Sequence, residues 1–175
     1  RAANHASHEG QAILRSLECD VPFSTGFIDI WSPGLMVDKM GNAKILTYID
    51  GMTGYAAIAP LPADPTSQHV VLAAFQHFFI PFGLPRLVVV DKDSLFMDKF
   101  SSLLDILPMT QDTVSPENHK AVRNERFHKY LNKVQRIHQA DKASFSEWLF
   151  AAMFATYAWN ASPIDGTNVS RSFAA

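Results

Sequence analysis

The stretch Leu87-Val88-Val89-Val90-Asp91 decides the fold. Four consecutive apolar residues, three of them β-branched, are typical of a strand that is buried on both faces of a sheet. Just before it, apolar residues over 67–79 recur with the period of one helical face. This predicts a helix that Ser67 caps and that Pro81 and Gly83 end. A helix that leads into a fully buried strand indicates a βαβ-like crossover.

Working outward from this strand, the sequence predicts a meander of strands before it and helices after it. Residues 51–54 (Gly-Met-Thr-Gly) are typical of a tight turn between two strands. The expected elements are strands over 27–31, 44–50 and 55–60, the helix over 67–79, a strand over 87–90, a short helix over 98–104, a weak strand over 107–110, a loop over 111–118, and helices over 119–139 and 144–159. This order predicts an α/β fold, with a five-stranded mixed sheet and helices on both faces. We expect residues 1–22 to form a polar lead-in segment and residues 23–175 to form the core domain.

Composition narrows the class of protein. Apolar residues make up 47% of the chain and charged residues 18%, which excludes a disordered chain. Fifteen Lys and Arg against 17 Asp and Glu exclude binding of nucleic acid through overall positive charge, but not through a local basic face. The single cysteine, Cys19, excludes a disulfide framework. The most apolar runs, 70–90 and 148–159, are interrupted or too short for a membrane span, so we expect no membrane partner.

Two aspartates at predicted strands are candidates for metal ligands. Asp29 lies among large apolar residues within the first strand, where a carboxylate is costly unless a metal or a cation pairs with it. Asp91 follows the buried strand, at the end where ligand sites of open α/β sheets lie. Together they could bind one hard cation through oxygen. The alternative is that each aspartate only caps a strand or a turn.

A third acid, Glu125, lies early in the long helix predicted over 119–139. At about 100° per residue, Glu125 shares its side of the helix with His128, Lys129, Asn132 and Arg136. The opposite side carries the apolar residues Phe127, Tyr130, Leu131, Val134 and Ile137. The pattern predicts a helix that packs an apolar stripe on the sheet and presents a carboxylate framed by cationic groups. The alternative is a solvated outer face.

The three acids, separated by 61 and 33 intervening residues, belong to a longer series of motifs. These are, in order, residues 29–34 (Asp-Ile-Trp-Ser-Pro-Gly), 45–50 with 53–55, Phe82-Gly83-Leu84-Pro85, residues 89–96 (Val-Val-Asp-Lys-Asp-Ser-Leu-Phe), Glu125-Arg126-Phe127 with Leu131, and Tyr157-Ala158-Trp159-Asn160 with Pro163, Thr167 and Ser172-Phe173. From about residue 23 to 173, the series resembles the catalytic core of retroviral and LTR-retrotransposon integrases. Among these, the motif around Asp91 is similar to the gypsy type. These integrases belong to the RNase H-like polynucleotidyl transferases.

The resemblance implies an RNase H-like fold and an enzyme that processes DNA 3′ ends and transfers them into target DNA. It implies that Asp29, Asp91 and Glu125 are the catalytic residues and hold Mg²⁺ or Mn²⁺, as two ions. Phosphate contacts would come from Lys120, Arg123, Lys129 and Arg136. It further implies DNA partners, a homo-oligomer and a nuclear location.

The sequence also departs from the family pattern. The segment 115–124 before Glu125 is longer than in the family and lacks glycine, which leaves Glu117 as a rival third acid. Arg171 stands before Ser172 where the family has a Ser-Pro-Phe block. The family's N-terminal zinc module is not expected in this piece, because that region offers only His5, His8 and Cys19. Two other functions stay open: an RNase H-like nuclease, and a decayed or domesticated core that acts as a DNA-binding or dimerisation module.

Overall fold

The structure is a computed structural model that describes residues 21–34, 36–91, 94–97, 100, 102, 106–114, 121–140 and 148–175. Its centre is one five-stranded sheet in the order β3-β2-β1-β4-β5. The strands are β1 (Thr25–Trp31), β2 (Asn42–Asp50), β3 (Ala56–Pro62), β4 (Leu87–Asp91) and β5 (Thr110–Val114). β1, β2 and β3 pair antiparallel, whereas β4 pairs parallel with both β1 and β5. The predicted mixed sheet of five strands is confirmed.

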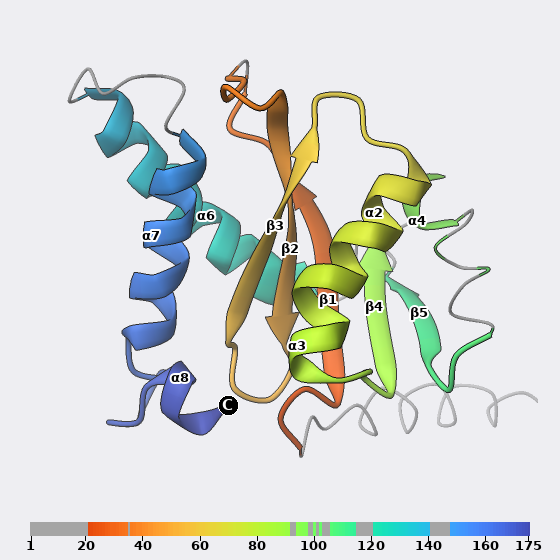
Figure 1. The fold of residues 1–175 in the computed structure, drawn as a ribbon. Helices are drawn as coiled ribbons and strands as arrows, with labels where there is room; N and C mark the ends of the chain where they lie inside the picture. The colour runs from red at the N-terminus through yellow and green to blue at the C-terminus, as the bar shows by residue number, and fades with distance from the viewer. Residues whose placement is uncertain are drawn as a thin grey trace, which may run out of the picture.

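Helices cover both faces of this sheet (Figure 1). The helical elements are α2 (Ser67–Ala74), η1 (Phe75–Phe79), α3 (Ile80–Phe82), α4 (Ser94–Met97), α6 (Ala121–Ala140), α7 (Trp148–Ala161) and α8 (Arg171–Ala174). One core cluster joins the sheet to α2, η1 and α4, and a second joins it to α6 and α7. The prediction of an α/β fold with helices on both faces is therefore confirmed.

Residue parity assigns each strand side chain to one of the two faces. In β1, β2 and β4, even-numbered residues such as Ile28, Leu46 and Val88 pack toward α2, and odd-numbered ones such as Phe27 and Val89 pack toward α6 and α7. This is the two-residue alternation of an extended chain. β1, β2 and β4 each have a neighbouring strand on both sides and an apolar cluster on both faces, so they are the central strands of the sheet.

The observed boundaries correct several predictions. The helix predicted over 67–79 continues without a break to Phe82, through a π-helical segment and past Pro81. Its N-cap is Thr66 instead of Ser67, because Thr66 and His69 form a reciprocal capping box. The fifth strand covers 110–114, so it begins at the last residue of the strand predicted over 107–110 and continues into the loop predicted over 111–118. Residues 107 and 108 belong to a turn instead of a strand. Parts of the predicted helices over 98–104 and 144–159 lie outside the described residues, as does the lead-in over 1–20.

The last turn of α7 is hydrogen-bonded to the edge strand β3 and to the turn before it. The side-chain amide of Asn160 accepts a hydrogen bond from the Ala56 N–H and donates one to its carbonyl, both at 2.8 Å. Trp159 Nε1 donates to the Gly54 carbonyl at 2.9 Å. These contacts hold α7 beside β3 and give the Trp-Asn motif a structural role.

Within the described part of the chain, no helix combines the length and apolarity needed to cross a lipid bilayer.

Candidate active site

Asp29 and Asp91 lie on β1 and β4, which are neighbouring parallel strands. The paired register of these two strands ends with Phe27 opposite Val89, and each aspartate follows two residues later along its strand. Both aspartates have the parity of Phe27 and Val89, whose side chains pack toward α6. Continued at the same offset, the β1–β4 register would set the two aspartates side by side on that face. Asp29 is half-buried and Asp91 is exposed.

Helix α6 crosses this face and brings His128 to Asp29. His128 Nδ1 lies 3.7 Å from Asp29 Oδ2, and His128 Nε2 lies 3.0 Å from Thr47 Oγ1. The Thr47 hydroxyl in turn donates to the Asp29 backbone carbonyl at 3.0 Å. Asp29 Oδ1 accepts a hydrogen bond of 2.7 Å from the Ile30 N–H. Side chains and backbone from β1, β2 and α6 therefore fix the surroundings of Asp29.

The protonation of His128 determines what it offers to Asp29. Burial lowers the pKa of His128 to about 4, so the ring is neutral near pH 7. Because the Thr47 hydroxyl donates to the Asp29 carbonyl, we assign Nε2 as the ring's donor. Nδ1 then presents a lone pair toward Asp29 Oδ2. Two lone-pair atoms that face each other repel, and a cation between them would relieve this repulsion.

Glu125 lies three residues before His128, one turn earlier on α6. Its carboxylate Oε2 lies 3.4 Å from Lys129 Nζ, and both side chains are more than half exposed. In the described residues, no three His, Cys, Asp or Glu side chains lie close enough together to hold one metal ion. The structure thus places Asp29 and Asp91 at corresponding positions on neighbouring strands and brings His128 of α6 to Asp29. Glu125, one turn earlier on α6, is paired with Lys129, and the described residues do not close a three-acid site. The rival acid, Glu117, lies outside the described residues.

The buried face of α6 differs in part from the predicted stripe. Phe127 and Leu131 are buried in the core as predicted, but Ile137 is 55% exposed. His128, predicted to border an open cleft, is held against β1 and β2 instead. Gln135 is buried, and Asn132 accepts a hydrogen bond from Trp31 Nε1 at 3.0 Å. The helix is therefore rotated so that polar side chains contact the end of β1.

Two of the residues predicted to bind DNA, Lys129 and Arg136, lie on the outer side of α6. Lys129, Asn132, Lys133, Arg136 and Ile137 line a shallow pocket of about 340 Å³. Lys133, which was not among the predicted residues, lies beside Lys129 and Arg136 in this pocket, and its spacing of four residues from Lys129 could have indicated this. Arg123 belongs to α6, but its side chain lies outside the described structure, as does all of Lys120.

Comparisons with known proteins give a match only at the level of structure: no protein-family model and no curated protein matches this chain. The "HTLV-2 integrase catalytic core domain in complex with magnesium (dimeric form)" matches with a TM-score of 0.67 and 14% identity, over 90% of this chain and 99% of that chain. The BIV integrase catalytic core matches with a TM-score of 0.65 and 17% identity, over 85% and 91%. A chain of the simian T-cell lymphotropic virus intasome in complex with PP2A regulatory subunit B56 gamma matches with a TM-score of 0.72 and 14% identity, over 88% and 54%.

These likenesses define the fold of the chain. It is RNase H-like, in the form seen in retroviral integrase catalytic cores. The resemblance inferred from the sequence is thereby confirmed for the fold.

Proposed function

We propose that this chain is an integrase-type catalytic core, of the retrotransposon and gypsy-like kind, that carries out DNA 3′-end processing and strand transfer in the nucleus. The observation that supports the proposal is that Asp29 and Asp91 each follow the last pair of the parallel β1–β4 register by two residues and share the parity of the side chains that pack toward α6. Two acids that only capped strands would have no need to share one face of the sheet with the polar side chains of α6. The integrase fold adds independent support.

The donor atoms at this site fit a hard divalent cation. Carboxylate oxygens are the ligands that Mg²⁺ and Mn²⁺ prefer, and the Nδ1 lone pair of His128 adds negative potential beside Asp29. The HTLV-2 integrase core was solved in complex with magnesium. When bound, one or two such ions would neutralise charge on the attacking and leaving oxygens of a phosphodiester.

In this proposal the three acids hold the metal, with Asp29 and Asp91 as the fixed pair and Glu125 as the adjustable member. Glu125 is paired with Lys129 on the helix surface. An exposed pair four residues apart contributes only about 0.3–0.5 kcal/mol, so a DNA phosphate that binds Lys129 releases Glu125 at little cost. His128 and Thr47 position Asp29, while Lys129, Lys133 and Arg136, together with the predicted Lys120 and Arg123, bind the DNA backbone.

We also propose that the core assembles with a second copy of itself through the outer face of α7. Helix α7 carries no charged residue, and Phe150, Met153, Phe154 and Tyr157 are 71%, 57%, 63% and 72% exposed. At the usual size of these side chains, they present roughly 500 Å² of largely apolar surface. A symmetric pair of such faces would bury roughly 1,000 Å², which reaches the lower bound of specific interfaces.

The substitution Asp91→Asn tests the proposed chemistry. The exchange keeps size and removes one negative charge, so the fold is retained while metal-dependent strand transfer falls by at least about a hundredfold. Activity is measured on labelled DNA ends with Mn²⁺, and folding by circular dichroism. The matched control is Asp64→Asn, an exposed aspartate between β3 and α2.

Strand transfer at the normal rate in folded Asp91→Asn would refute the assignment. A parallel assay with an RNA–DNA hybrid separates the integrase from an RNase H-like nuclease. Binding of DNA by a wild-type chain that neither binds Mn²⁺ nor transfers strands would instead identify a non-catalytic core.

A further inference from the structure

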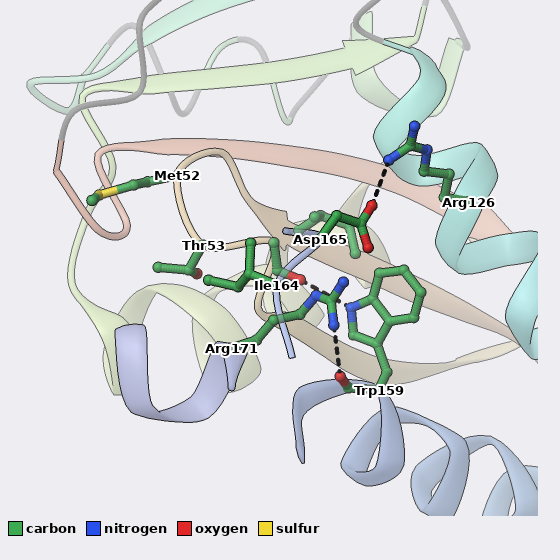
Figure 2. Close-up of a pocket in the computed structure, with 9 residues that line it drawn as sticks. Met52, Thr53, Arg126, Trp159, Ile164, Asp165 and Arg171 are labelled. Carbon is green, nitrogen blue, oxygen red and sulfur yellow. Dashed lines mark hydrogen bonds and ion pairs between the residues drawn. The ribbon is translucent and has the colours of Figure 1, made fainter. Parts of the chain in front are cut away.

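A second pocket, of about 470 Å³, lies on the α6 and α7 side of the molecule (Figure 2). It opens between the turn that joins β2 to β3, the first turns of α6, and the segment that joins α7 to α8. Its charged lining residues are Arg126, Asp165 and Arg171. Two cationic groups against one carboxylate leave the pocket with a net positive charge.

Arg171 is built into this pocket as a fixed group. Its side chain is buried, with 8% of the residue exposed, and its Nη1 donates to the carbonyls of Trp159, Ser162 and Pro163 at 3.0–3.2 Å. The guanidinium carbon lies 4.3 Å from the centre of a Trp159 ring. Figure 2 shows the guanidinium in the middle of the pocket, with Asp165 and Arg126 beyond it. A cation held in this way loses little side-chain entropy when it binds a ligand.

Asp165 lies between the two arginines. Arg126 Nη1 is 3.2 Å from Asp165 Oδ2, and the two side chains are 63% and 81% exposed. Burial lowers the pKa of Arg171, and the negative charge of Asp165 opposes that shift, so Asp165 also acts on Arg171. The carboxylate thus lies where both cations attract an anion, and an exposed ion pair of this kind is readily exchanged for another anion.

We propose that this pocket is a phosphate-binding subsite, in which a phosphoryl group replaces the Asp165 carboxylate between Arg126 and Arg171. A phosphoryl group offers three acceptor oxygens and more negative charge than a carboxylate, and arginine binds it in a bidentate manner. The N–H groups of the two arginines can thereby bind the phosphoryl oxygens, and no further cation is needed.

The position of the pocket favours the backbone of a DNA strand as the carrier of this phosphate. Arg126 directly follows Glu125 on α6. Lys129, Lys133 and Arg136 follow Arg126 after three, seven and ten residues, a spacing that keeps all four side chains on one side of a helix. The Arg126 side chain of the pocket and the three cationic side chains that follow it on α6 thus form one row. This choice of carrier rests on the proposed function, whereas the phosphate site itself does not.

Two substitutions of one ion pair test the subsite, because they act on phosphate binding in opposite directions. Arg126→Gln removes a cationic donor and is expected to weaken binding about tenfold. Asp165→Asn removes the competing carboxylate and is expected to tighten binding about threefold. A structural ion pair would make both variants behave alike. Arg171 is left intact because its hydrogen bonds to three carbonyls support the fold.

Binding is measured without divalent metal, by calorimetry for pyrophosphate and by fluorescence anisotropy for a short labelled DNA duplex. For DNA, Arg126→Gln should also lower the slope of log K against log salt by about one. The control is Arg86→Gln, an exposed arginine that precedes β4, pairs with Ser24 and does not line the pocket.

The two ligands separate the sources of the phosphate. A response with the duplex alone identifies the DNA backbone, a response with pyrophosphate alone identifies a free phosphate compound, and a response with both identifies a site that accepts either. Equal effects of Arg126→Gln and Arg86→Gln on both ligands, or weaker binding by Asp165→Asn, would overturn the subsite. Normal pyrophosphate binding by a chain without strand-transfer activity would overturn the proposed function and leave the subsite intact.

Discussion

At the scale of single residues, the candidate site depends on one relay of contacts to Asp29. Thr47 binds the backbone carbonyl of Asp29, and His128 binds Thr47 while its other ring nitrogen faces the Asp29 carboxylate. Groups that orient a metal ligand in this manner are worth about 10–100-fold in metal affinity or activity. The neutral state of the ring matters, because a protonated His128 would compete with a cation for Asp29.

The variant His128→Phe tests this relay. Phenylalanine preserves a buried ring against the sheet but removes both nitrogen atoms. We expect Mn²⁺ affinity and strand transfer to fall about tenfold each, with the thermal midpoint little changed. Isothermal titration with Mn²⁺ measures the first effect. His77→Ala, at an exposed histidine on η1, is the control, and unchanged Mn²⁺ affinity in folded His128→Phe would contradict the positioning role.

The two aspartates of the site could be predicted from sequence, whereas their partners could not. Asp29 and Asp91 each stand in or at the end of a recognisable apolar run, and the spacing of strand side chains then puts them on one face. Thr47 and His128 are 81 residues apart. Their contact depends on the rotation of α6 about its axis, which tertiary packing sets and which the exposed Ile137 shows to differ from the simple helical projection.

At the scale of elements, the turn between β2 and β3 is organised by a buried carboxylate. Asp50 is fully buried, and its Oδ2 accepts hydrogen bonds from the N–H and the hydroxyl of Thr53 at 2.8 and 2.6 Å. Its Oδ1 accepts a third from the Phe23 N–H at 2.7 Å, which ties the start of the domain to this turn. Gly54 completes the turn with a positive φ of 70°.

We predict that Asp50→Asn destabilises the domain by about 2–3 kcal/mol. The asparagine retains one acceptor oxygen but turns its amide N–H groups toward donors, which leaves buried groups unpaired. Urea denaturation followed by tryptophan fluorescence measures the change. The exposed Asp64→Asn should change the free energy of unfolding by less than about 0.5 kcal/mol. Equal midpoints for Asp50→Asn and the wild type would contradict the role of the carboxylate.

Strands with an apolar pattern were predictable at this scale, and the polar edge strand was not. The segments that became β1 to β4 are rich in apolar or β-branched residues. The sequence of β5, Thr-Gln-Asp-Thr-Val, has only one apolar side chain, that of Val114, and it is a strand because it pairs along the whole length of β4. Long-range pairing outweighs local preference here. The same applies to Pro81, which the packed helix tolerates because Phe78, Phe79 and Phe82 contact the core around it.

At the scale of the whole molecule, the sheet separates an apolar side from the side that carries the candidate site. The α2 face is covered by a continuous apolar cluster, while the α6 face holds the two aspartates, His128 and the row of cations. The formal net charge of the chain is −2, so the row of cations on α6 is a local feature that the overall composition does not reveal. On the same side, Trp148 is buried in the core and Trp159 packs against it, while their helix α7 also exposes an aromatic face.

The exposed face of α7 leads to a prediction about assembly. Phe154 lies between Phe150 and Tyr157 on this face, and all three are more than 60% exposed. Phe154→Lys would place a charge at the centre of each half of a symmetric interface, where its burial is opposed by desolvation and by the like charge of the partner. Central interface residues typically contribute at least about 2 kcal/mol, so the dissociation constant of the dimer should rise at least about thirtyfold.

Analytical ultracentrifugation over a series of protein concentrations measures this constant. The control, Ile80→Lys, introduces the same charge at a residue that is 74% exposed on α3, and it should leave the dimer intact. Far-ultraviolet circular dichroism confirms that both variants remain folded. Self-association that is equally strong in the two variants would exclude the α7 face as the interface. Dissociation in Phe154→Lys alone would indicate that the helix that packs Trp148 and Ala152 into the core also joins two copies of the chain.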